Sequence, residues 1–245
     1  MKLSIIVPTT RDIDKLYQSL KIQTFKDFEV LVQREKGLVN ARNLGWQKAQ
    51  GEIIAFIDDD VILDKEWAKE VVNSFSGGAG CVMGGVITEK GSRDNDWSNP
   101  ILKKLLKRIW NTQACNMAFS KNALIESGGF DTAYDLGVGE WSEPDLVFKV
   151  ASLGFKVITN EKALLTHCPG KTGIYKKRGK YSYHRMKNFM LFSKRWLKMD
   201  LNLFAVIVIF NIYWLWKFLS TGNKNWLGGL WGTVKGLCTP IRGVS

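Results

Sequence analysis

The sequence predicts an α/β fold in which a mostly parallel β-sheet is flanked by helices and followed by a basic helical region. Short apolar runs alternate with amphipathic segments through the first 170 residues, the pattern of consecutive βαβ units. The run Ile53–Ile57 ends in three consecutive acids, Asp58, Asp59 and Asp60, where an open sheet binds its ligands. The length of 245 residues, 45% of them hydrophobic, suffices for one substantial core.

The predicted elements follow from hydrophobic periodicity and from capping residues. Strands are expected, in chain order, at residues 3–8, 28–33, 53–58, 80–87, 113–119 and 155–159. Helices are expected at residues 12–23, 38–49, 65–75 and from Ser120 to Gly129. Asp64 and Ser120 are side chains suited to the N-cap, and Gly128 can take the left-handed conformation that ends a helix.

Two segments after the fourth strand differ from this pattern. Residues 89–100 are polar and rich in turn formers, which predicts a loop. Residues 101–109 place leucine and isoleucine opposite lysine and arginine, which predicts a short basic amphipathic helix. This helix is either a surface helix packed on the core or a lid that touches the membrane or the acceptor.

The positive charge of the chain is concentrated in its last third. Residues 1–170 carry 21 Lys and Arg against 22 Asp and Glu, whereas residues 171–245 carry 14 Lys and Arg against one acid, Asp200. We therefore expect an α/β domain over 1–170 and a separate basic, aromatic helical region over 171–245, with an anionic partner of its own. Nucleic acid is not expected as this partner, because the cations flank an apolar run and no nucleic-acid-binding motif appears.

The apolar run Leu201–Trp216 is short for a membrane span, which needs about 20 residues, and it contains two asparagines. Three arrangements are open: a helix in the membrane plane or shallowly inserted, a single span over 201–219, or a helix packed on the catalytic domain. No secretion signal opens the sequence, and the four cysteines are widely spaced. We expect the protein at the cytoplasmic face of a membrane.

The acidic cluster predicts a cation site. Two carboxylates on alternate residues of an extended segment point the same way, so Asp58 and Asp60 can share a hard divalent cation. Phosphate oxygens and water would fill the remaining coordination positions, which is how a protein holds a nucleoside diphosphate. The alternative is a solvated acidic turn.

Four blocks resemble the family 2 glycosyltransferases of the GT-A fold, in order and at similar spacing. They are SIIVPTT, GLVNARNLGWQKAQGEIIAFIDDD, NMAFSKNALIESGGFD and GEWSEPDLVFKVASLGF, with YHRMKNFMLF resembling a later segment. The resemblance covers residues 3–195. It implies a Rossmann-like domain with a DXD motif, and inverting transfer of a sugar from a nucleotide diphosphate sugar to an acceptor hydroxyl in glycan biosynthesis, with Mn²⁺ or Mg²⁺ as cofactor.

The resemblance also implies roles for the acids. Asp60 would hold the metal, Asp58 would bridge to the metal or the ribose, and Asp59 would lie on the donor side and support the turn. His167 occupies a place where relatives supply a metal or phosphate ligand, although a lone histidine after a strand is also a common structural residue.

The general base is expected in the segment before the Asp145-Leu146 pair. The resemblance favours Glu143, with Glu140 as a competitor, because the attacking hydroxyl must lose a proton. Asp145 could instead serve the helix N-terminus, where an acid favours the dipole. Trp141 would stack on the acceptor sugar or fill the core.

The remaining donor-side residues come from four other segments. Pro8, Thr9 and Thr10 would hold the nucleobase and ribose. Arg42 would brace the acidic motif or reach the diphosphate, unless it is a solvated helix residue, and Asn116 would line the donor-sugar pocket. An acidic turn usual in the family is absent after the second strand, where Glu35 could substitute, so UDP, GDP and dTDP sugars all remain open.

The acceptor is expected to be a lipid-linked saccharide, because the basic aromatic tail would place the enzyme on the surface that carries it. A polyprenyl-phosphate monosaccharide synthase is the alternative enzyme, with the lipid phosphate as nucleophile. A non-catalytic protein that only binds a sugar nucleotide is the third hypothesis.

Overall fold

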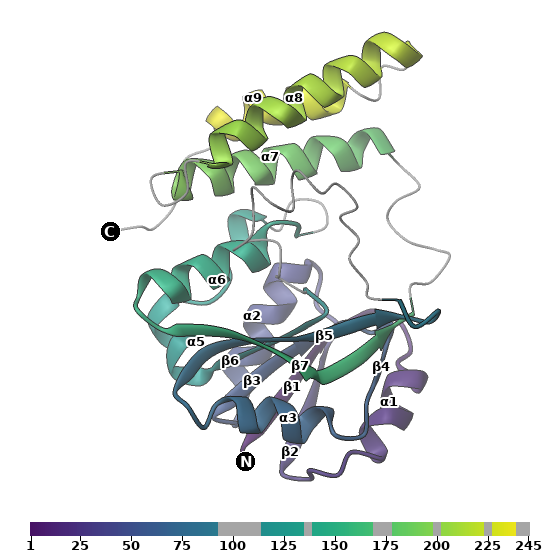
Figure 1. Ribbon diagram of the computed structural model, residues 1–245, viewed down its shortest axis with the longest axis vertical. Helices are drawn as coiled ribbons and strands as arrows, with labels where there is room; N and C mark the ends of the chain where they lie inside the picture. Colours follow the sequence, from purple (N-terminus) through teal and green to yellow (C-terminus); the bar gives the residue numbers. More distant parts are fainter. Residues whose placement is uncertain (93–113, 135–138, 169–177, 198–201, 223–226, 239–245) are drawn as a thin grey trace. The chain divides into compact units, whose positions relative to one another are not determined.

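The first part of the chain forms a seven-stranded sheet with helices on both faces (Figure 1). The computed structural model describes residues 1–92, 114–134, 139–168, 178–197, 202–222 and 227–238. The strands are β1 (Leu3–Pro8), β2 (Phe28–Gln33), β3 (Ile53–Ile57), β4 (Val61–Leu63), β5 (Ala79–Thr88), β6 (Asn116–Ser120) and β7 (Lys156–His167). Their spatial order is β2-β1-β3-β6-β5-β7-β4.

The sheet is mixed. β1 runs parallel to β2 and β3, and β5 runs parallel to β7. β6 runs antiparallel to β3 and β5, and β4 runs antiparallel to β7. The predicted α/β class is confirmed, and the sheet differs from the expectation in having as many antiparallel as parallel pairings. Apolar runs identify strands but do not specify their direction, which is why the sequence did not reveal this.

Four helices lie close to the predicted positions: α1 (Asp14–Lys21), α2 (Leu38–Lys48), α3 (Trp67–Ser74) and α5 (Lys121–Ser127). They are followed by α6 (Ser142–Ser152), α7 (Arg178–Trp196), α8 (Asn202–Thr221) and α9 (Leu227–Cys238). Strand β4 was not predicted because three residues directly after the acids carry too short a pattern. The predicted helix 101–109 and most of the predicted loop 89–100 lie outside the described residues.

The predicted helix caps have different outcomes. Ser120 caps α5, because its Oγ accepts a hydrogen bond from the backbone N–H of Ala123 at 3.2 Å. Gly128 ends this helix in the left-handed conformation, with φ of 72°. Asp64 is not the N-cap of α3, since that helix begins at Trp67. Its carboxylate instead accepts from the N–H of Glu66 at 2.9 Å, in the turn before the helix.

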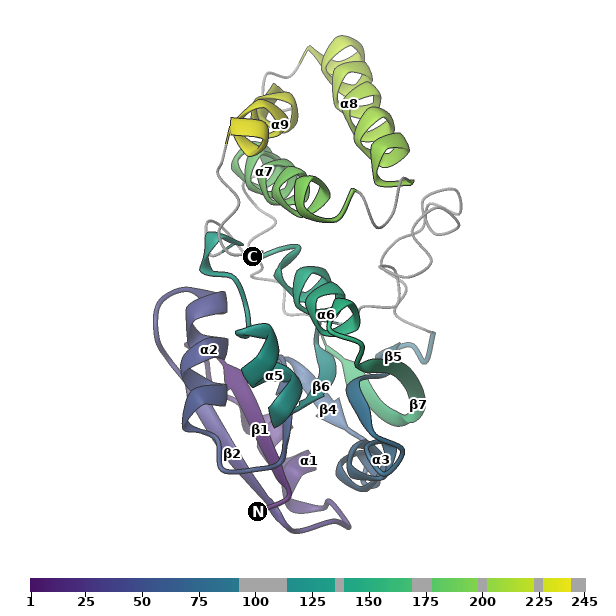
Figure 2. The same cartoon turned by 90° about the vertical axis from the view of Figure 1, so that its left-hand side faces the viewer.

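Strand β3 is buried along its whole length. Helices α1 and α3 lie on one side of the sheet, and α2 and α5 lie on the other (Figure 2). The odd-numbered residues of β3 belong to a core cluster that includes Leu16 of α1 and Trp67 of α3. On the opposite face, Phe56 meets the rings of Phe119 and Phe130 edge to face, with centroids 6.0 and 5.0 Å away. Packing on both faces fixes the end of β3, and therefore the position of the acids that follow it.

The chain divides into two compact units. Unit 1 comprises Met1–Asp96, Asn111–Asp131 and Leu146–Lys171, and it contains the sheet. Unit 2 comprises Trp97–Trp110, Thr132–Asp145 and Thr172–Ser245, and it contains α7, α8 and α9. The division falls within α6, so residues 132–145 group with the C-terminal helices.

The helices of unit 2 are joined by aromatic and polar contacts. Phe210 of α8 meets Phe189 of α7 edge to face, with ring centroids 5.2 Å apart. The hydroxyl of Thr233 on α9 donates to Oδ1 of Asn211 on α8 at 3.0 Å. Within the described ranges, no helix combines the length and the apolar character that crossing a bilayer requires. The single span considered for residues 201–219 is therefore not found in that part of the chain.

A glycine in β5 gives a direct test of the sheet packing. A Cβ at Gly84 would lie 2.2 Å from Asn116 Nδ2 and 2.5 Å from the carbonyl oxygen of Ala163. We expect Gly84→Ala to lower the free energy of unfolding by about 2–4 kcal/mol, through overpacking and loss of the Asn116 hydrogen bonds. A Cβ at Gly77 meets nothing within 4 Å, so Gly77→Ala is the control and should change stability by less than about 0.5 kcal/mol. Equal stability of the two variants in urea denaturation would contradict this packing.

Candidate active site

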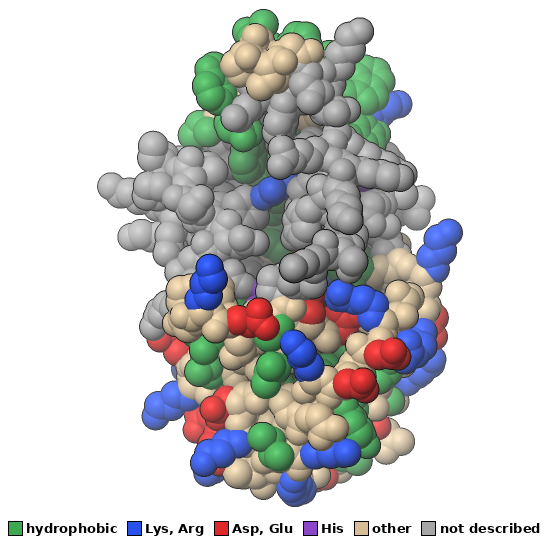
Figure 3. All heavy atoms as spheres, turned by 90° about the vertical axis from the view of Figure 1, so that its right-hand side faces the viewer, with side chains coloured by type: hydrophobic (Ala, Val, Ile, Leu, Met, Phe, Trp, Pro, Cys, Tyr) green, Lys and Arg blue, Asp and Glu red, His purple; other side chains and the backbone are tan. Residues whose placement is uncertain are grey.

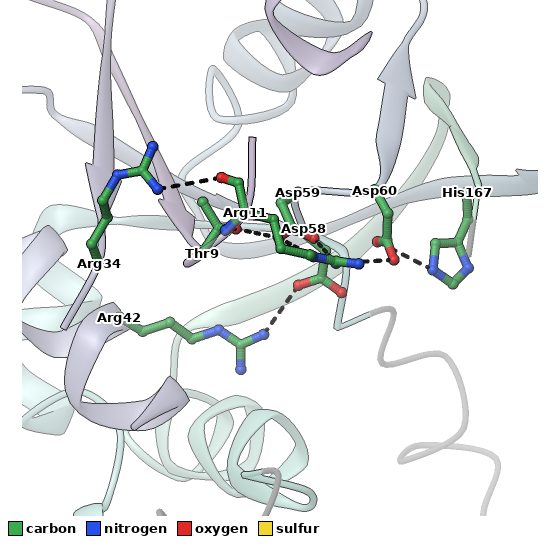
Figure 4. Close-up of polar contacts among 8 residues, drawn as sticks. All are labelled: Thr9, Arg11, Arg34, Arg42, Asp58, Asp59, Asp60 and His167. Atoms are coloured by element: carbon green, nitrogen blue, oxygen red, sulfur yellow. Dashed lines mark hydrogen bonds and ion pairs between the residues drawn. The ribbon is translucent and has the colours of Figure 1, made fainter. Parts of the chain in front are cut away.

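Three carboxylates follow strand β3 and lie close together (Figure 4). The side chains of Asp58, Asp59 and Asp60 are 34%, 9% and 22% exposed. Like charges at this spacing repel one another, so the folded chain needs cations within reach of them. Arg42 lies beside Asp58, Arg11 pairs with both Asp59 and Asp60, and His167 lies beside Asp60.

Asp58 is paired with an arginine from α2. Nη2 of Arg42 lies 3.5 Å from Oδ1 of Asp58. The guanidinium is almost fully buried, and its carbon lies 5.5 Å from the centroid of the Phe130 ring. Because an arginine cannot lose its proton in the interior, this buried charge needs an acid nearby. The structure therefore places Arg42 in the interior beside the acidic motif, and not in solvent.

Asp59 is held by two residues that follow β1. Its carboxylate accepts hydrogen bonds from Nε of Arg11 at 2.8 Å, from Nη2 of the same guanidinium, and from the hydroxyl of Thr9. The Thr9 hydroxyl also accepts the backbone N–H of Arg11 at 2.9 Å. Sequence reasoning missed Arg11. The available signal was its place three residues after a strand that neighbours β3, since parallel strand ends meet at one sheet edge.

Asp60 lies between a histidine and the same arginine. Nε2 of His167 is 3.5 Å from Oδ1 of Asp60, and Nη2 of Arg11 is 3.4 Å from Oδ2. The antiparallel pairing of Val61 with His167 brings the two side chains together. Burial alone would raise the pKa of Asp60, but the hydrogen bond and charge of His167, together with Arg11, hold the pKa of this carboxyl below its ordinary value.

The predicted metal ligands are only partly brought together. Asp60 and His167 are in contact, whereas Asp58 is directed toward Arg42. Among the residues that the structure describes, no group of three or more acidic, histidine or cysteine side chains is arranged to hold a metal ion. One carboxylate and one imidazole still fit a divalent cation that takes its other ligands from substrate phosphates and water.

Asn116 does not have the environment expected of a donor-sugar ligand. Its amide is 1% exposed, and both N–H groups are used, toward the carbonyl oxygens of Gly85 and Ala163 at 2.8 Å each. Its carbonyl oxygen accepts the indole N–H of Trp67 at 2.9 Å. This side chain joins two strands and a helix inside unit 1, so it has no donor left for a sugar.

The other predicted donor residues lie at the same edge of the sheet or beside it. Pro8 ends β1, Thr10 is exposed, and the backbone N–H of Thr9 donates to the carbonyl oxygen of Gln33 at 2.8 Å. Glu35 follows β2, and its carboxylate lies 3.7 Å from the ammonium of Lys48. These positions permit contact with a nucleotide, but they do not by themselves define a nucleotide-binding site.

The predicted base lies in unit 2, at the start of α6. Glu143 is the second residue of this helix and is 6% exposed. Glu140 precedes the helix, and Nε of Arg185 on α7 lies 4.0 Å from its carboxylate. The amide of Asn188 donates to the carbonyl oxygens of Glu140 and Tyr134 at 3.0 and 3.2 Å. The segment before α6 is therefore fixed to α7 by its backbone.

Asp145 is a buried ionic anchor within unit 2. Its carboxylate accepts from Nη1 of Arg195 at 2.7 and 2.8 Å, and from the indole N–H of Trp196 at 2.8 Å. The hydroxyl of Tyr134 is 3.2 Å away. Asp145 and Arg195 are both almost fully buried. The role expected for Asp145 at the helix N-terminus is therefore not its main interaction. Its ion pair with Arg195 links the start of α6 to the end of α7.

Trp141 has the environment of a core residue. Its ring is 6% exposed and lies 4.6 and 5.4 Å from the ring centroids of Phe189 and Phe192. It is also the non-glycine residue with positive φ in the described chain, at 73°. Stacking on an acceptor sugar would need a ring face that this packing covers. The positive φ marks the tight turn into α6.

A sheet edge with clustered carboxylates, bracing arginines and a histidine defines an α/β protein built to bind a charged ligand there. Residues 7–131, just over half of the chain, match the family model described as Glycosyl transferase family 2. The chain belongs to this family, which confirms the resemblance seen in its sequence blocks.

A curated relative also matches part of the chain. The chain is 24% identical over 149 residues to the glucosyl-dolichyl phosphate glucuronosyltransferase of Haloferax volcanii. The aligned part is 54% of this chain and 48% of the relative, so the chain spans about half the length of that protein.

Solved structures share the fold. The mannosyltransferase PcManGT from Pyrobaculum calidifontis, in complex with GDP-Man and Mn²⁺, matches with a TM-score of 0.57 at 16% identity, covering 97% of this chain and 73% of that one. S. aureus TarS residues 1–349, in complex with UDP-GlcNAc, matches with a TM-score of 0.69 at 15% identity, covering 96% and 81%. At these identities the likeness shows the GT-A fold alone.

The buried ion pair of Asp145 gives a prediction about stability that does not depend on any activity. Asp145→Ala leaves the charge of Arg195 buried without its carboxylate and should cost about 3–5 kcal/mol of unfolding free energy. The double variant Asp145→Leu/Arg195→Met removes both charges and should recover most of that loss. Thermal and urea denaturation measure both. An Asp145→Ala protein as stable as the wild type would contradict the assigned anchor.

Proposed function

We propose that the protein is an inverting glycosyltransferase that moves a sugar from a nucleotide diphosphate sugar to a hydroxyl of a lipid-linked saccharide. The observation that carries this proposal is the braced acidic cluster at the end of β3 in a chain of glycosyl transferase family 2. The similar structures hold GDP-Man and UDP-GlcNAc, which supports a nucleotide sugar without naming the base. The acceptor class is supported by the relative whose name gives glucosyl-dolichyl phosphate as its substrate.

Asp60 and His167 would hold the divalent cation, Mn²⁺ or Mg²⁺, with Asp58 as a further acid beside them. When bound, such a cation neutralises charge on the departing diphosphate. Arg42 keeps the cluster in place through Asp58. Thr9 and Asp59 tie the end of β1 to the acidic segment, where Pro8, Thr10 and Glu35 would meet the nucleotide.

Glu143 would take the proton from the attacking hydroxyl. A carboxylate is needed because an alcohol becomes a competent nucleophile only as it loses its proton. Glu140 is the alternative, but its carboxylate lies near Arg185 and its backbone is held by Asn188. These contacts favour a positioning role for Glu140, and the chemical role is assigned to Glu143 because the family resemblance favours that position.

The proposed location is the cytoplasmic face of a membrane, with the basic C-terminal region in contact with anionic lipid. The charge supports this, since residues 171–245 carry 14 Lys and Arg against one acid. A polyprenyl-phosphate monosaccharide synthase is the second candidate function. It is favoured by the dolichyl phosphate in the relative's name, because a lipid phosphate could itself be the nucleophile.

Variants of the two glutamates test the proposed chemistry. UDP, GDP and dTDP sugars are screened with Mn²⁺ for transfer into glucosyl-polyprenyl phosphate and into polyprenyl phosphate. We expect transfer to the saccharide, and we expect Glu143→Gln to lower kcat by about a hundredfold or more, the usual effect of losing a general base. The control Glu140→Gln should keep activity within about tenfold.

Two outcomes would contradict the hydroxyl acceptor. Transfer into polyprenyl phosphate alone, with Glu143→Gln near full activity, would favour the synthase, because a phosphate nucleophile is already ionised. Absence of transfer with every nucleotide sugar and both acceptors would overturn the proposed function itself.

Arg11 gives a prediction about cation binding that does not depend on turnover. Its guanidinium pairs with Asp59 and Asp60, so a divalent cation at Asp60 must approach a fixed positive charge. We expect Arg11→Ala to bind Mn²⁺ about fivefold more tightly in titration calorimetry without donor, since like charges near 4 Å cost about 1 kcal/mol in water. Arg34 contacts only the carbonyl oxygen of Arg11 among the bonds shown in Figure 4, so Arg34→Ala is the charge-matched control. Weaker Mn²⁺ binding by Arg11→Ala would contradict this arrangement.

A further inference from the structure

Helix α8 carries a continuous apolar stripe on its exposed surface. Its residues recur every three or four positions, which places them on one side of the helix. They are Phe204, Val208, Ile212, Trp216 and Leu219, and their exposed fractions range from 41% to 71%. A helix of a water-soluble protein directs such a stripe toward the core, whereas this one directs it outward.

Helix α9 also directs large apolar residues outward, and its small residues lie on the opposite, buried side. Gly229, Gly232 and Gly236 are buried, and a Cβ at Gly232 would lie 2.3 Å from the carbonyl oxygen of Tyr183 on α7. On the opposite side of α9, Trp231 and Val234 are 58% and 49% exposed. Small residues between helices with large apolar residues outside are typical of helices that pack in lipid, where close packing rather than the hydrophobic effect joins them.

The outward residues of both helices form what we call the α8–α9 apolar face. It comprises Phe204, Val208, Ile212, Trp216 and Leu219 of α8 with Trp231 and Val234 of α9. Hydrophobic side chains gather on the described surface of these helices in Figure 3. Large apolar residues exposed in this number on two packed helices mark an interaction site and require an occupant.

The charge beside this face identifies the occupant. Lys235 is exposed on α9, and its ammonium lies 5.8 Å from the centroid of the Trp231 ring. Tryptophan and lysine at the border of an apolar surface suit the headgroup level of a bilayer. A second copy of this chain would bring the same excess of positive charge, which opposes self-association. An anionic lipid surface complements both the apolar face and the charge.

We propose that the α8–α9 apolar face inserts into the headgroup and acyl boundary of an anionic bilayer, with both helices lying along the membrane surface. This inference deepens the proposed function and rests on it, because membrane docking serves an enzyme whose acceptor is attached to a lipid. An enzyme held on that surface meets the acceptor at a raised effective concentration.

Vesicle flotation of the full-length protein tests docking without any substrate. Vesicles of phosphatidylcholine are compared with vesicles that also contain phosphatidylglycerol. We expect the wild type to float with the anionic vesicles, and we expect Trp216→Glu and Trp231→Glu each to lower the partition coefficient at least tenfold. Ile125 is 59% exposed on α5 in unit 1, so Ile125→Glu is the matched control and should float as the wild type does.

Three results would overturn the inference. They are a wild type that stays unbound, face variants that float as well as the control, and a lipid-free oligomer that Trp216→Glu dissociates in light scattering. The last would identify a second copy as the occupant. Transfer to a detergent-dispersed acceptor tests the proposed function alone, so failed docking and failed catalysis are distinguishable. Circular dichroism of each variant verifies that the helices remain folded.

Discussion

The site depends on the balance of charge around three carboxylates at the end of a buried strand. β3 is packed on both faces, so Asp58, Asp59 and Asp60 cannot move apart to relieve their repulsion. Three side chains from other parts of unit 1 contact these acids: Arg42 from α2, Arg11 from the segment after β1, and His167 from the end of β7. Each also fixes an element against β3, so the charge balance and the fold support one another.

The sequence predicted the positions of strands and helices better than it predicted which side chains pair with one another. Strand positions followed from apolar runs, and the Ser120 cap and Gly128 terminus followed from local chemistry. Partners far apart in sequence were not predictable from spacing. Asp145 pairs with Arg195 and Trp196 about fifty positions later, and Arg11 reaches the acids from the segment after β1. Such pairings depend on strand order and direction, which the hydrophobic pattern does not encode.

The residues predicted for sugar contact show why side-chain type alone misleads. Asn116 and Trp141 have side chains suited to sugar contact, but both are used in packing. Asn116 lies between strands, and Trp141 packs against α7. Buried polar and aromatic groups need interaction partners, and neighbouring residues of the fold already provide those partners. The acids that follow β3 and Glu143 are the residues that we propose for sugar transfer, and the α8–α9 apolar face is the surface that we propose for contact with lipid.

The central claim is that Asp60, with His167, receives a divalent cation at the end of β3. A crystal structure with Mn²⁺ and a nucleoside diphosphate tests it most directly, with UDP, GDP and dTDP tried in turn. The account predicts an anomalous manganese peak about 2.0–2.6 Å from a carboxylate oxygen of Asp60, with phosphate oxygens completing its coordination. A nucleotide bound elsewhere, or a bound nucleotide with Asp60 still paired to Arg11 and no manganese beside it, would contradict the account.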